Sequence, residues 1–138
     1  MSTNSRIGIE IANGRVQSVY CHWDGYPKGV GQVLIDHYGS REKVGELIGL
    51  GSISSLGPEA SCPEGHTFET PVKGHTVAHH RDRGDEYETR TDDTVEDYRK
   101  SDIGEFAYLY TKAGEWCYIN GWGEREIRSL DAALSLAK

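Results

Sequence analysis

Apolar residues alternate with polar or small ones over 7–11 and again over 15–23. This period of two is typical of β-strands, and the Asn13-Gly14 pair between the two runs favours a two-residue type I′ turn. We therefore expect a hairpin in which Ile7 lies opposite Tyr20. The side of this hairpin that we expect to be buried consists of Ile7, Ile9, Ile11, Val16 and Tyr20.

Two runs with helical spacing follow this hairpin. The first covers 30–38 and ends at Gly39, a residue that commonly follows the last turn of a helix. Ser40 is the expected N-cap of the second helix, and residues 52–71, with three prolines and no apolar period, are expected to be irregular. The apolar stripe of the second helix consists of Val44, Leu47 and Ile48.

The second half of the chain returns to β character. We expect a strand over 72–80, a tight charged turn over 81–85 and a helix over 91–101. Aromatic alternation predicts a second hairpin from 106–110 and 116–120. A final helix is expected after the cap residue Ser129, with an apolar face of Leu130, Ala133, Leu134 and Ala137.

This order of elements predicts one domain over residues 1–138, of the α+β class. We expect an antiparallel sheet built from two hairpins plus a middle strand, with helices packed mainly on one face. The chain has 138 residues, a size at which one compact domain is stable without disulfides or metals. No apolar run approaches the ~20 residues that span a bilayer, and we expect no membrane association.

Charge and cysteine content narrow the setting. The 22 acidic and 15 basic residues give a net charge of −7, so direct nucleic-acid binding is not expected. Cys21, Cys62 and Cys117 are odd in number and widely spaced, which indicates free thiols in a reducing compartment. The start of the chain shows no apolar signal segment, and we expect a cytoplasmic protein.

The heptapeptide Cys-His-Trp-Asp-Gly-Tyr-Pro at 21–27, the first motif, is the most unusual sequence in the chain. On an extended strand His22 and Asp24 share a face, so the carboxylate could orient the imidazole as a base. Cys21 points to the opposite face and is not available as a nucleophile. The alternative is a strand-ending turn in which Trp23 and Tyr26 fill the edge of the core.

The second motif covers 79–85 and contains two arginines beside a glycine. Arg81 and Arg83 could hold a phosphate or carboxylate, and Asp82 and Asp85 could accept hydrogen bonds from ribose hydroxyls. The alternative is a set of local surface ion pairs. The two motifs together supply the candidate ligand-binding residues Trp23, Asp24, Tyr26, His80, Arg81, Asp82 and Arg83.

The spacing of Cys62, His66, His75 and His79 resembles that of zinc ligands. On the strand expected over 72–80, His75 and His79 would lie ~13 Å apart, which is too far to share one ion. We therefore expect neither a metal site nor a cofactor.

Acidic residues dominate 82–102, where nine acids face four bases. If 91–101 is helical, Asp92 with Glu96 and Asp93 with Asp97 form two rows of like charge. Ordered negative charge of this kind can imitate a phosphate backbone and attract a basic groove, although an acidic face can also serve solubility alone. The candidate partner-binding residues are Asp85, Glu86, Glu88, Asp92, Asp93, Glu96 and Asp97.

Several stretches of the chain resemble a family of small proteins carried by tailed phages and prophages. The stretches that carry the resemblance are 6–9, the first motif at 21–27, 37–38, 41–44, 53–57 and the His-Arg-Asp-Arg-Gly sequence at 80–84. The first half matches closely and the second half loosely. Most members have no assigned activity, so the resemblance implies a viral accessory protein acting in the bacterial cytoplasm and transfers no catalytic residue.

These expectations lead to one function and two alternatives. The first is a non-enzymatic, anti-CRISPR-like inhibitor whose acidic face occupies a basic, nucleic-acid-binding surface on a host defence protein or ribonucleoprotein complex. The second is a small-molecule binder that sequesters a nucleotide-derived immune signal, and the third is a hydrolase-like enzyme that uses His22 and Asp24. One cavity lined by Trp23, Asp24, Arg81 and Arg83 would favour the small-molecule binder, and separated motifs would favour the inhibitor.

Overall fold

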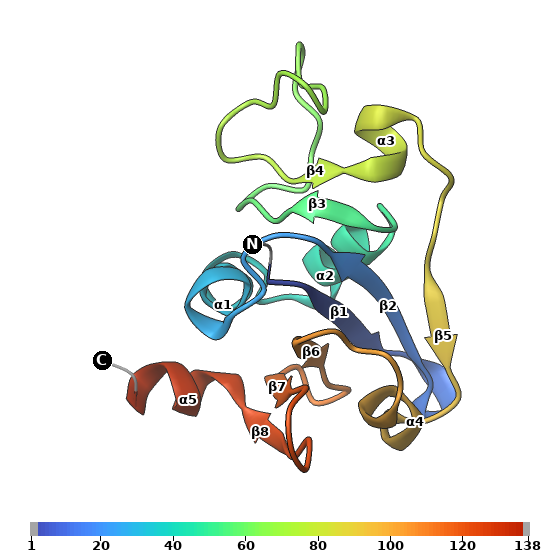
Figure 1. Ribbon diagram of the computed structural model, residues 1–138, viewed down its shortest axis with the longest axis vertical. Coiled ribbons are helices and arrows are strands. Elements are labelled where there is room, and N and C mark those ends of the chain that lie inside the picture. Colours follow the sequence, from blue (N-terminus) through green and yellow to red (C-terminus); the bar gives the residue numbers. More distant parts are fainter. Residues whose placement is uncertain (1–2, 137–138) are drawn as a thin grey trace.

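The computed structural model describes residues 3–136, which form one eight-stranded mixed sheet with helices around it (Figure 1). The strands run in the order β4-β3-β2-β1-β6-β7-β8, and β5 pairs with β2 beside this path. The bounds are β1 Ser5–Glu10, β2 Val16–Cys21, β3 Ile53–Ser55, β4 Val77–Ala78, β5 Arg90–Asp92, β6 Phe106–Tyr110, β7 Trp116–Asn120 and β8 Ile127–Ser129.

Most strand pairs are antiparallel, as expected for the α+β class. Two pairs are parallel: β1 with β6, where Ser5 lies opposite Phe106, and β2 with β3, where Cys21 lies opposite Ile53. The first of these pairs joins the two predicted hairpins into one sheet, because β1 and β6 are the central strands. The second pair extends the sheet from the end of the first motif's strand toward β4.

The helices are short, and α1, α2, α4 and α5 pack buried apolar side chains against the sheet, whereas α3 has no buried residue. A π-helical turn, η2 (Pro27–Gly31), leads into α1 (Gln32–His37). Within residues 3–136 no helix is long and apolar enough to cross a membrane. The other helices are α2 Arg41–Ile48, α3 His79–Arg83, α4 Val95–Lys100 and α5 Leu130–Leu136.

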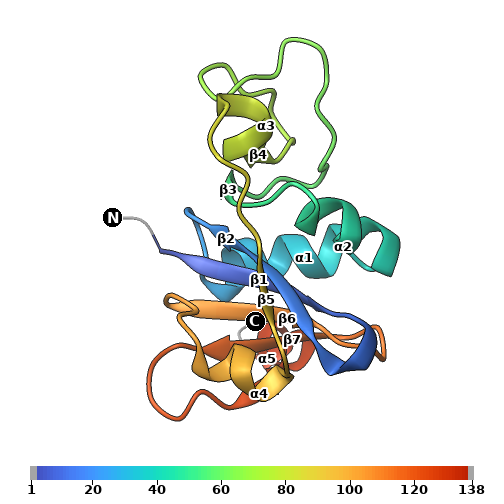
Figure 2. The same cartoon turned by 90° about the vertical axis from the view of Figure 1, so that its right-hand side faces the viewer.

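Two clusters of buried side chains occupy opposite faces of the sheet. The larger one packs α1, α2 and α5 against one face, and Figure 2 shows α1 and α2 side by side there. The smaller one packs Tyr98 of α4 against Val16 and Leu109 on the other face. The expectation that helices pack mainly on one face is therefore confirmed, with α4 as the exception.

Several sequence predictions are confirmed in detail. The second hairpin has the predicted strands, with Tyr108 opposite Tyr118 at its centre. The Ser40 hydroxyl accepts a hydrogen bond from the Lys43 amide, and the Ser129 hydroxyl accepts one from the Ala132 amide, so both predicted N-caps are present. Ala137, predicted on the face of the last helix, lies outside the described residues.

The predicted register of the first hairpin is wrong by one residue. Ile7 lies opposite Val19 rather than Tyr20. The turn closes through a hydrogen bond from the Ile11 amide to the Arg15 carbonyl oxygen (2.8 Å), which encloses the three residues 12–14 instead of two. A shift of one residue in register moves every side chain of the strand to the other face of the sheet. Val16 and Tyr20 therefore point to the face that does not carry Ile7.

The middle of the chain differs most from the prediction. The segment expected to be irregular contains β3, and the strand expected over 72–80 is reduced to β4 because α3 begins at His79. The expected charged turn is the body of α3, which Gly84 ends in a left-handed conformation (φ 82°). The helix expected over 91–101 begins only at Val95, after β5, and β8 was not predicted.

Candidate functional site

The first motif forms a tight turn at the end of β2. Asp24 adopts a left-handed conformation (φ 57°), which ends the alternation of the strand. Gly25 is packed so closely that a Cβ atom there would lie 2.8 Å from the Thr3 carbonyl oxygen. This turn leaves Trp23 and Tyr26 each 44% exposed, so neither ring fills the core edge.

The centre of the second motif is a buried network. The Asp82 side chain is 1% exposed, and its carboxylate accepts hydrogen bonds from the Ala78 amide (2.7 Å) and from Arg81 Nε (2.8 Å). His66 Nδ1 accepts from the Val72 amide, so Nε2 carries the hydrogen, which is shared between the Thr76 carbonyl oxygen (3.1 Å) and Asp82 (3.2 Å). With the Cys62 thiol at 3.8 Å the carboxylate has four partners and is a structural group.

Arg81 extends this network into the long loop between β3 and β4. Its guanidinium donates to the carbonyl oxygens of Ala60 and Thr76. The Phe68 amide donates to the Asp82 carbonyl oxygen (3.1 Å), which holds this loop residue beside α3. Four of the five N–H groups of Arg81 are used in these bonds, so Arg81 and Asp82 serve to position Phe68.

The two motifs meet at one cavity of about 330 Å³, the first cavity. It lies between the end of β2, β3, the long loop and α3. The Arg83 guanidinium carbon stands 4.3 Å from the centre of the Phe68 ring, within the range of a cation–π contact. The residues that line the first cavity are His22, Trp23, Ser54, Phe68, His79 and Arg83.

Electrostatically, the first cavity suits an anion. Arg83 supplies a permanent positive charge, and Asp85 holds its Nε through both carboxylate oxygens (3.0 Å each). Burial, together with the nearby charge of Arg83, lowers the pKa of His79, so this imidazole is neutral at pH 7. None of the six lining residues is acidic.

A second cavity of about 220 Å³ adjoins the first, because Trp23 lines both. Asp24 and Tyr26 of the first motif lie in its wall. Of the predicted ligand-binding residues, Trp23 and Arg83 therefore meet in the first cavity, and Trp23, Asp24 and Tyr26 meet in the second. His80, Arg81 and Asp82 line neither.

The expected pairing of His22 with Asp24 is not formed. His22 Nδ1 is hydrogen-bonded to the Tyr20 hydroxyl at 2.7 Å. Asp24 turns away because its backbone is left-handed, and it lines the second cavity instead. A tyrosine hydroxyl rather than a carboxylate therefore orients the imidazole.

The acidic residues do not form the predicted helical rows. Thr94 caps α4 by accepting a hydrogen bond from the Asp97 amide (3.0 Å), so Asp92 and Asp93 precede the helix. Three of the seven candidate carboxylates are paired with cations. The pairs are Asp85 with Arg83, Asp92 with Arg90 (3.1 Å), and Glu96 with Arg99 and Lys100.

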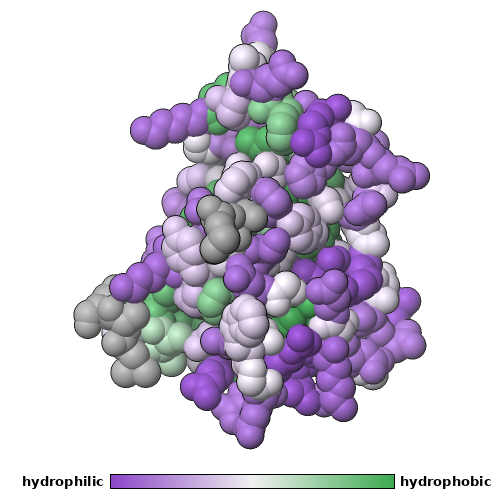
Figure 3. Space-filling view, in the orientation of Figure 1, coloured by the Kyte–Doolittle hydropathy of each residue, from purple (hydrophilic) through white to green (hydrophobic). Residues whose placement is uncertain are grey.

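The remaining acids still define a surface. Glu86, Glu88, Asp93 and Asp97 are exposed and form no ion pair with the described residues. They lie on the segment that runs from α3 through β5 to α4 along one side of the molecule (Figure 1). Hydrophilic atoms predominate on that side in the space-filling view (Figure 3).

The zinc spacing is not assembled into a site. Over residues 3–136, no three or more His, Cys, Asp or Glu side chains are grouped so that they could hold a metal ion. His66 is occupied by the Asp82 network, and His79 lines the first cavity. The strand assumed for the distance between His75 and His79 is not present, because His79 belongs to α3.

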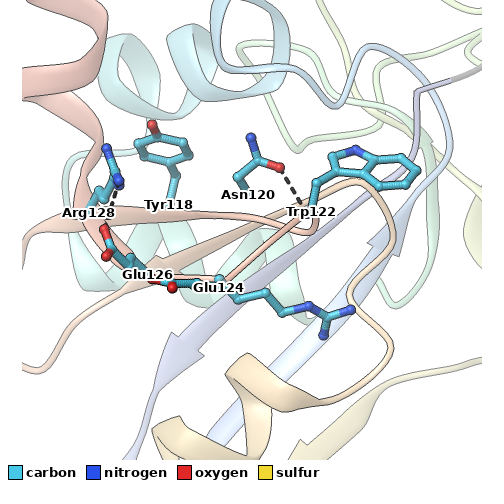
Figure 4. Close-up of a pocket in the computed structure, with 7 residues that line it drawn as sticks. Tyr118, Asn120, Trp122, Glu124, Glu126 and Arg128 are labelled. Carbon is cyan, nitrogen blue, oxygen red and sulfur yellow. Dashed lines mark hydrogen bonds and ion pairs between the residues drawn. The ribbon is translucent and has the colours of Figure 1, made fainter.

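Another cavity, of about 340 Å³, lies where β7 turns into β8 (Figure 4). Trp122 is 69% exposed at its rim, and the sequence indicates this by placing the residue between two glycines. The charged groups here have partners: Glu126 pairs with Arg128 (2.7 Å), and Arg125 donates to backbone carbonyl oxygens, including that of Ser101. This cavity is lined by two acids, Glu124 and Glu126, and contains none of the predicted residues.

Sequence reasoning missed four contributors to the first cavity: Ser54, Phe68, His79, and His22 in a binding role. Ser54 and Phe68 lie in the segment expected to be irregular, where no periodic pattern marks them. His79 was placed on a strand, whereas it opens α3. Only its position as the first residue of the second motif could have indicated its role.

Comparisons with protein-family models, with curated proteins and with solved structures found no match to this chain. The resemblance to phage-carried proteins therefore stays a prediction.

The Asp82 network predicts an acid-sensitive contribution to stability. Burial opposes ionisation of Asp82, but hydrogen bonds from Arg81 and from the Ala78 amide outweigh it and lower the pKa of the carboxyl. Because the pKa is lower in the folded protein, the ionised carboxyl stabilises the fold at any pH above its pKa in the unfolded chain, near 3.9. This contribution is lost as the pH falls through the pKa in the folded protein. We expect Asp82→Asn to reduce the free energy of unfolding by about 3 kcal/mol at pH 7, measured by urea titration.

The difference between Asp82→Asn and the wild type should be smaller at about pH 3, because below the unfolded pKa near 3.9 the unfolded chain binds the proton more readily than the folded protein, whose Asp82 pKa is lowered. Asp93→Asn, an exposed acid, should stay within about 0.5 kcal/mol of the wild type at both pH values. A loss of equal size at both pH values for Asp82→Asn would contradict the network.

Proposed function

We propose that the protein binds an anionic, nucleotide-derived small molecule in the first cavity and acts by sequestering it. The observation that supports this proposal is that the two unusual motifs, more than fifty residues apart in sequence, line the same cavity. Of the alternatives drawn from the sequence, this geometry favours the small-molecule binder. The inhibitor was the first expectation, and it depended on ordered rows of carboxylates that the helix start at Val95 prevents.

The cavity supplies the groups that such a ligand needs. Arg83 donates through Nε and Nη2 to Asp85, and its Nη1 has no partner among the described residues, so that this edge of the guanidinium can donate to phosphate oxygens while Phe68 and Asp85 hold the group in place. His22 and His79 offer further ring nitrogens. Trp23 presents an exposed indole on which a base can stack.

The proposed setting comes from the family resemblance. A phage-carried accessory protein in the bacterial cytoplasm would meet nucleotide-derived signals that activate host defence. Tight binding without turnover removes such a signal from its receptor, so this function requires no catalytic group.

Binding of mononucleotides tests this proposal. At a concentration about 100 times its Kd, GMP or AMP should raise the free energy of unfolding by about 2.7 kcal/mol. Because Arg83 contributes charge-assisted hydrogen bonds, Arg83→Met should weaken binding by about 10-fold or more in isothermal titration calorimetry. Arg128→Met is the matched control, since Arg128 is also an exposed arginine paired with a neighbouring acid.

The affinity of Arg128→Met should equal that of the wild type. Absence of any nucleotide-induced stabilisation in the wild-type protein would refute the proposal. Equal affinity of Arg83→Met and wild type would show that the nucleotide binds elsewhere.

A second candidate function rests on the four unpaired acids Glu86, Glu88, Asp93 and Asp97. We propose, as the alternative, that this surface docks on a basic, nucleic-acid-binding surface of a host defence protein or complex. Surface charge of one sign steers association toward the opposite sign, and such binding weakens with salt.

The two candidates can be separated by measuring whether the protein protects a phage in bacterial strains that each carry one defence system. They differ in which substitutions abolish this protection. Replacement of the four unpaired acids by lysine abolishes protection if the acidic surface acts, and Arg83→Met leaves it intact. The reverse result is expected for the small-molecule binder. As a control for charge alone, Glu42→Lys with Glu46→Lys, two exposed acids of α2, is compared with Asp93→Lys with Asp97→Lys, which changes the net charge by the same amount.

A further inference from the structure

The first and second cavities are adjacent, because one exposed indole belongs to the walls of both. Trp23 stands between the cationic first cavity of about 330 Å³ and the second cavity of about 220 Å³. Small-molecule sites typically measure ~300–1,000 Å³, so the first cavity alone is the size of a mononucleotide site. The second cavity provides room for an additional ring beyond Trp23.

The second cavity has the composition of a base-binding site. Trp23 and Tyr26 form aromatic walls, and Val30, Val33 and Leu56 contribute apolar surface. Exposed aromatic faces beside an apolar floor favour stacking of a planar ring.

Polar groups at this cavity match the edges of a nucleotide. Gln32 Nε2 donates to both oxygens of Asp36, at 3.0 Å and 3.1 Å, and so fixes the direction of the carboxylate. Asp24 and Asp36 can accept hydrogen bonds from amino groups of a base, and Lys28 can pair with a phosphate oxygen.

The turn that carries these walls is preformed. The Val30 amide donates to the Asp24 carbonyl oxygen (2.8 Å), and a Cβ atom at Gly29 would overlap that same oxygen. The backbone between Asp24 and Val30 is therefore closed on itself, and contacts within the protein fix the wall of the second cavity. A preformed site loses little conformational entropy on binding.

We infer that the ligand is a dinucleotide whose two nucleotide units lie on either side of Trp23. This inference rests on the proposed function and adds the size of the ligand to it. One phosphate binds Arg83 in the first cavity, and the second base stacks against Tyr26 in the second cavity. The phosphodiester that joins the units passes Trp23, and Lys28 lines the cavity that holds the second unit.

Calorimetric titration with the linear dinucleotide pGpG and with GMP tests the inference. The wild type should bind pGpG at least about 10-fold more tightly than GMP, because one more base stacks. Tyr26→Leu should weaken pGpG binding by about 10-fold and leave GMP binding within about 2-fold. Tyr87→Leu is the matched control, because Tyr87 is 46% exposed and lines neither cavity, and it should change neither affinity.

The outcomes separate this inference from the proposed function. Equal wild-type affinities for pGpG and GMP would overturn the dinucleotide and leave nucleotide binding in place. An equal loss of both affinities in Tyr26→Leu would also overturn it, since Tyr26 would then contact the first unit. If neither probe binds, the proposed function itself fails.

Discussion

The candidate site depends on the hydrogen bonds that satisfy the buried carboxylate of Asp82. A buried charge is strongly destabilising unless it is paired and hydrogen-bonded, and here the partners come from β4, α3 and the long loop. His66 and the backbone groups bound by Arg81 can meet this requirement only if the loop folds back against α3. The same folding places Phe68 under Arg83 and so builds one wall of the first cavity.

The opposite wall depends on a steric constraint. Gly25 fits against Thr3 only because it lacks a side chain, and the left-handed Asp24 before it directs Trp23 outward. The pairing of β2 with β3 and of β3 with β4 then brings the end of β2 next to α3. Two motifs distant in the sequence thus become neighbours through one short strand between them.

What could be predicted from the sequence was local. The second hairpin and the caps at Ser40 and Ser129 follow from patterns within a few residues, and the structure confirms them. The register of the first hairpin was wrong because Asn13-Gly14 also fits a three-residue turn. The strands β3 and β4 have only three and two residues, and their pairing partners are distant, so no period of two marks them.

The candidate site was predictable only in part for the same reason. Trp23 and Arg83 could be named from unusual motifs, but their meeting depends on β3 and the long loop. The acidic rows were predicted from helical spacing that Thr94 interrupts, because its hydroxyl caps the helix two residues after Asp92. Capping is a local signal, and reading it at Thr94 would have shortened that helix correctly.

The packing of Phe68 against Arg83 is the most direct measure of this account, because it exists only if the loop, the Asp82 network and α3 are assembled together. Nuclear Overhauser spectroscopy of the wild-type protein at pH 7 reports it without any substitution. The account predicts cross-peaks between the Phe68 ring protons and the Arg83 side chain, with the arginine methylene signals shifted upfield by the ring. Phe68 signals at random-coil positions, with no cross-peak to α3, would contradict it.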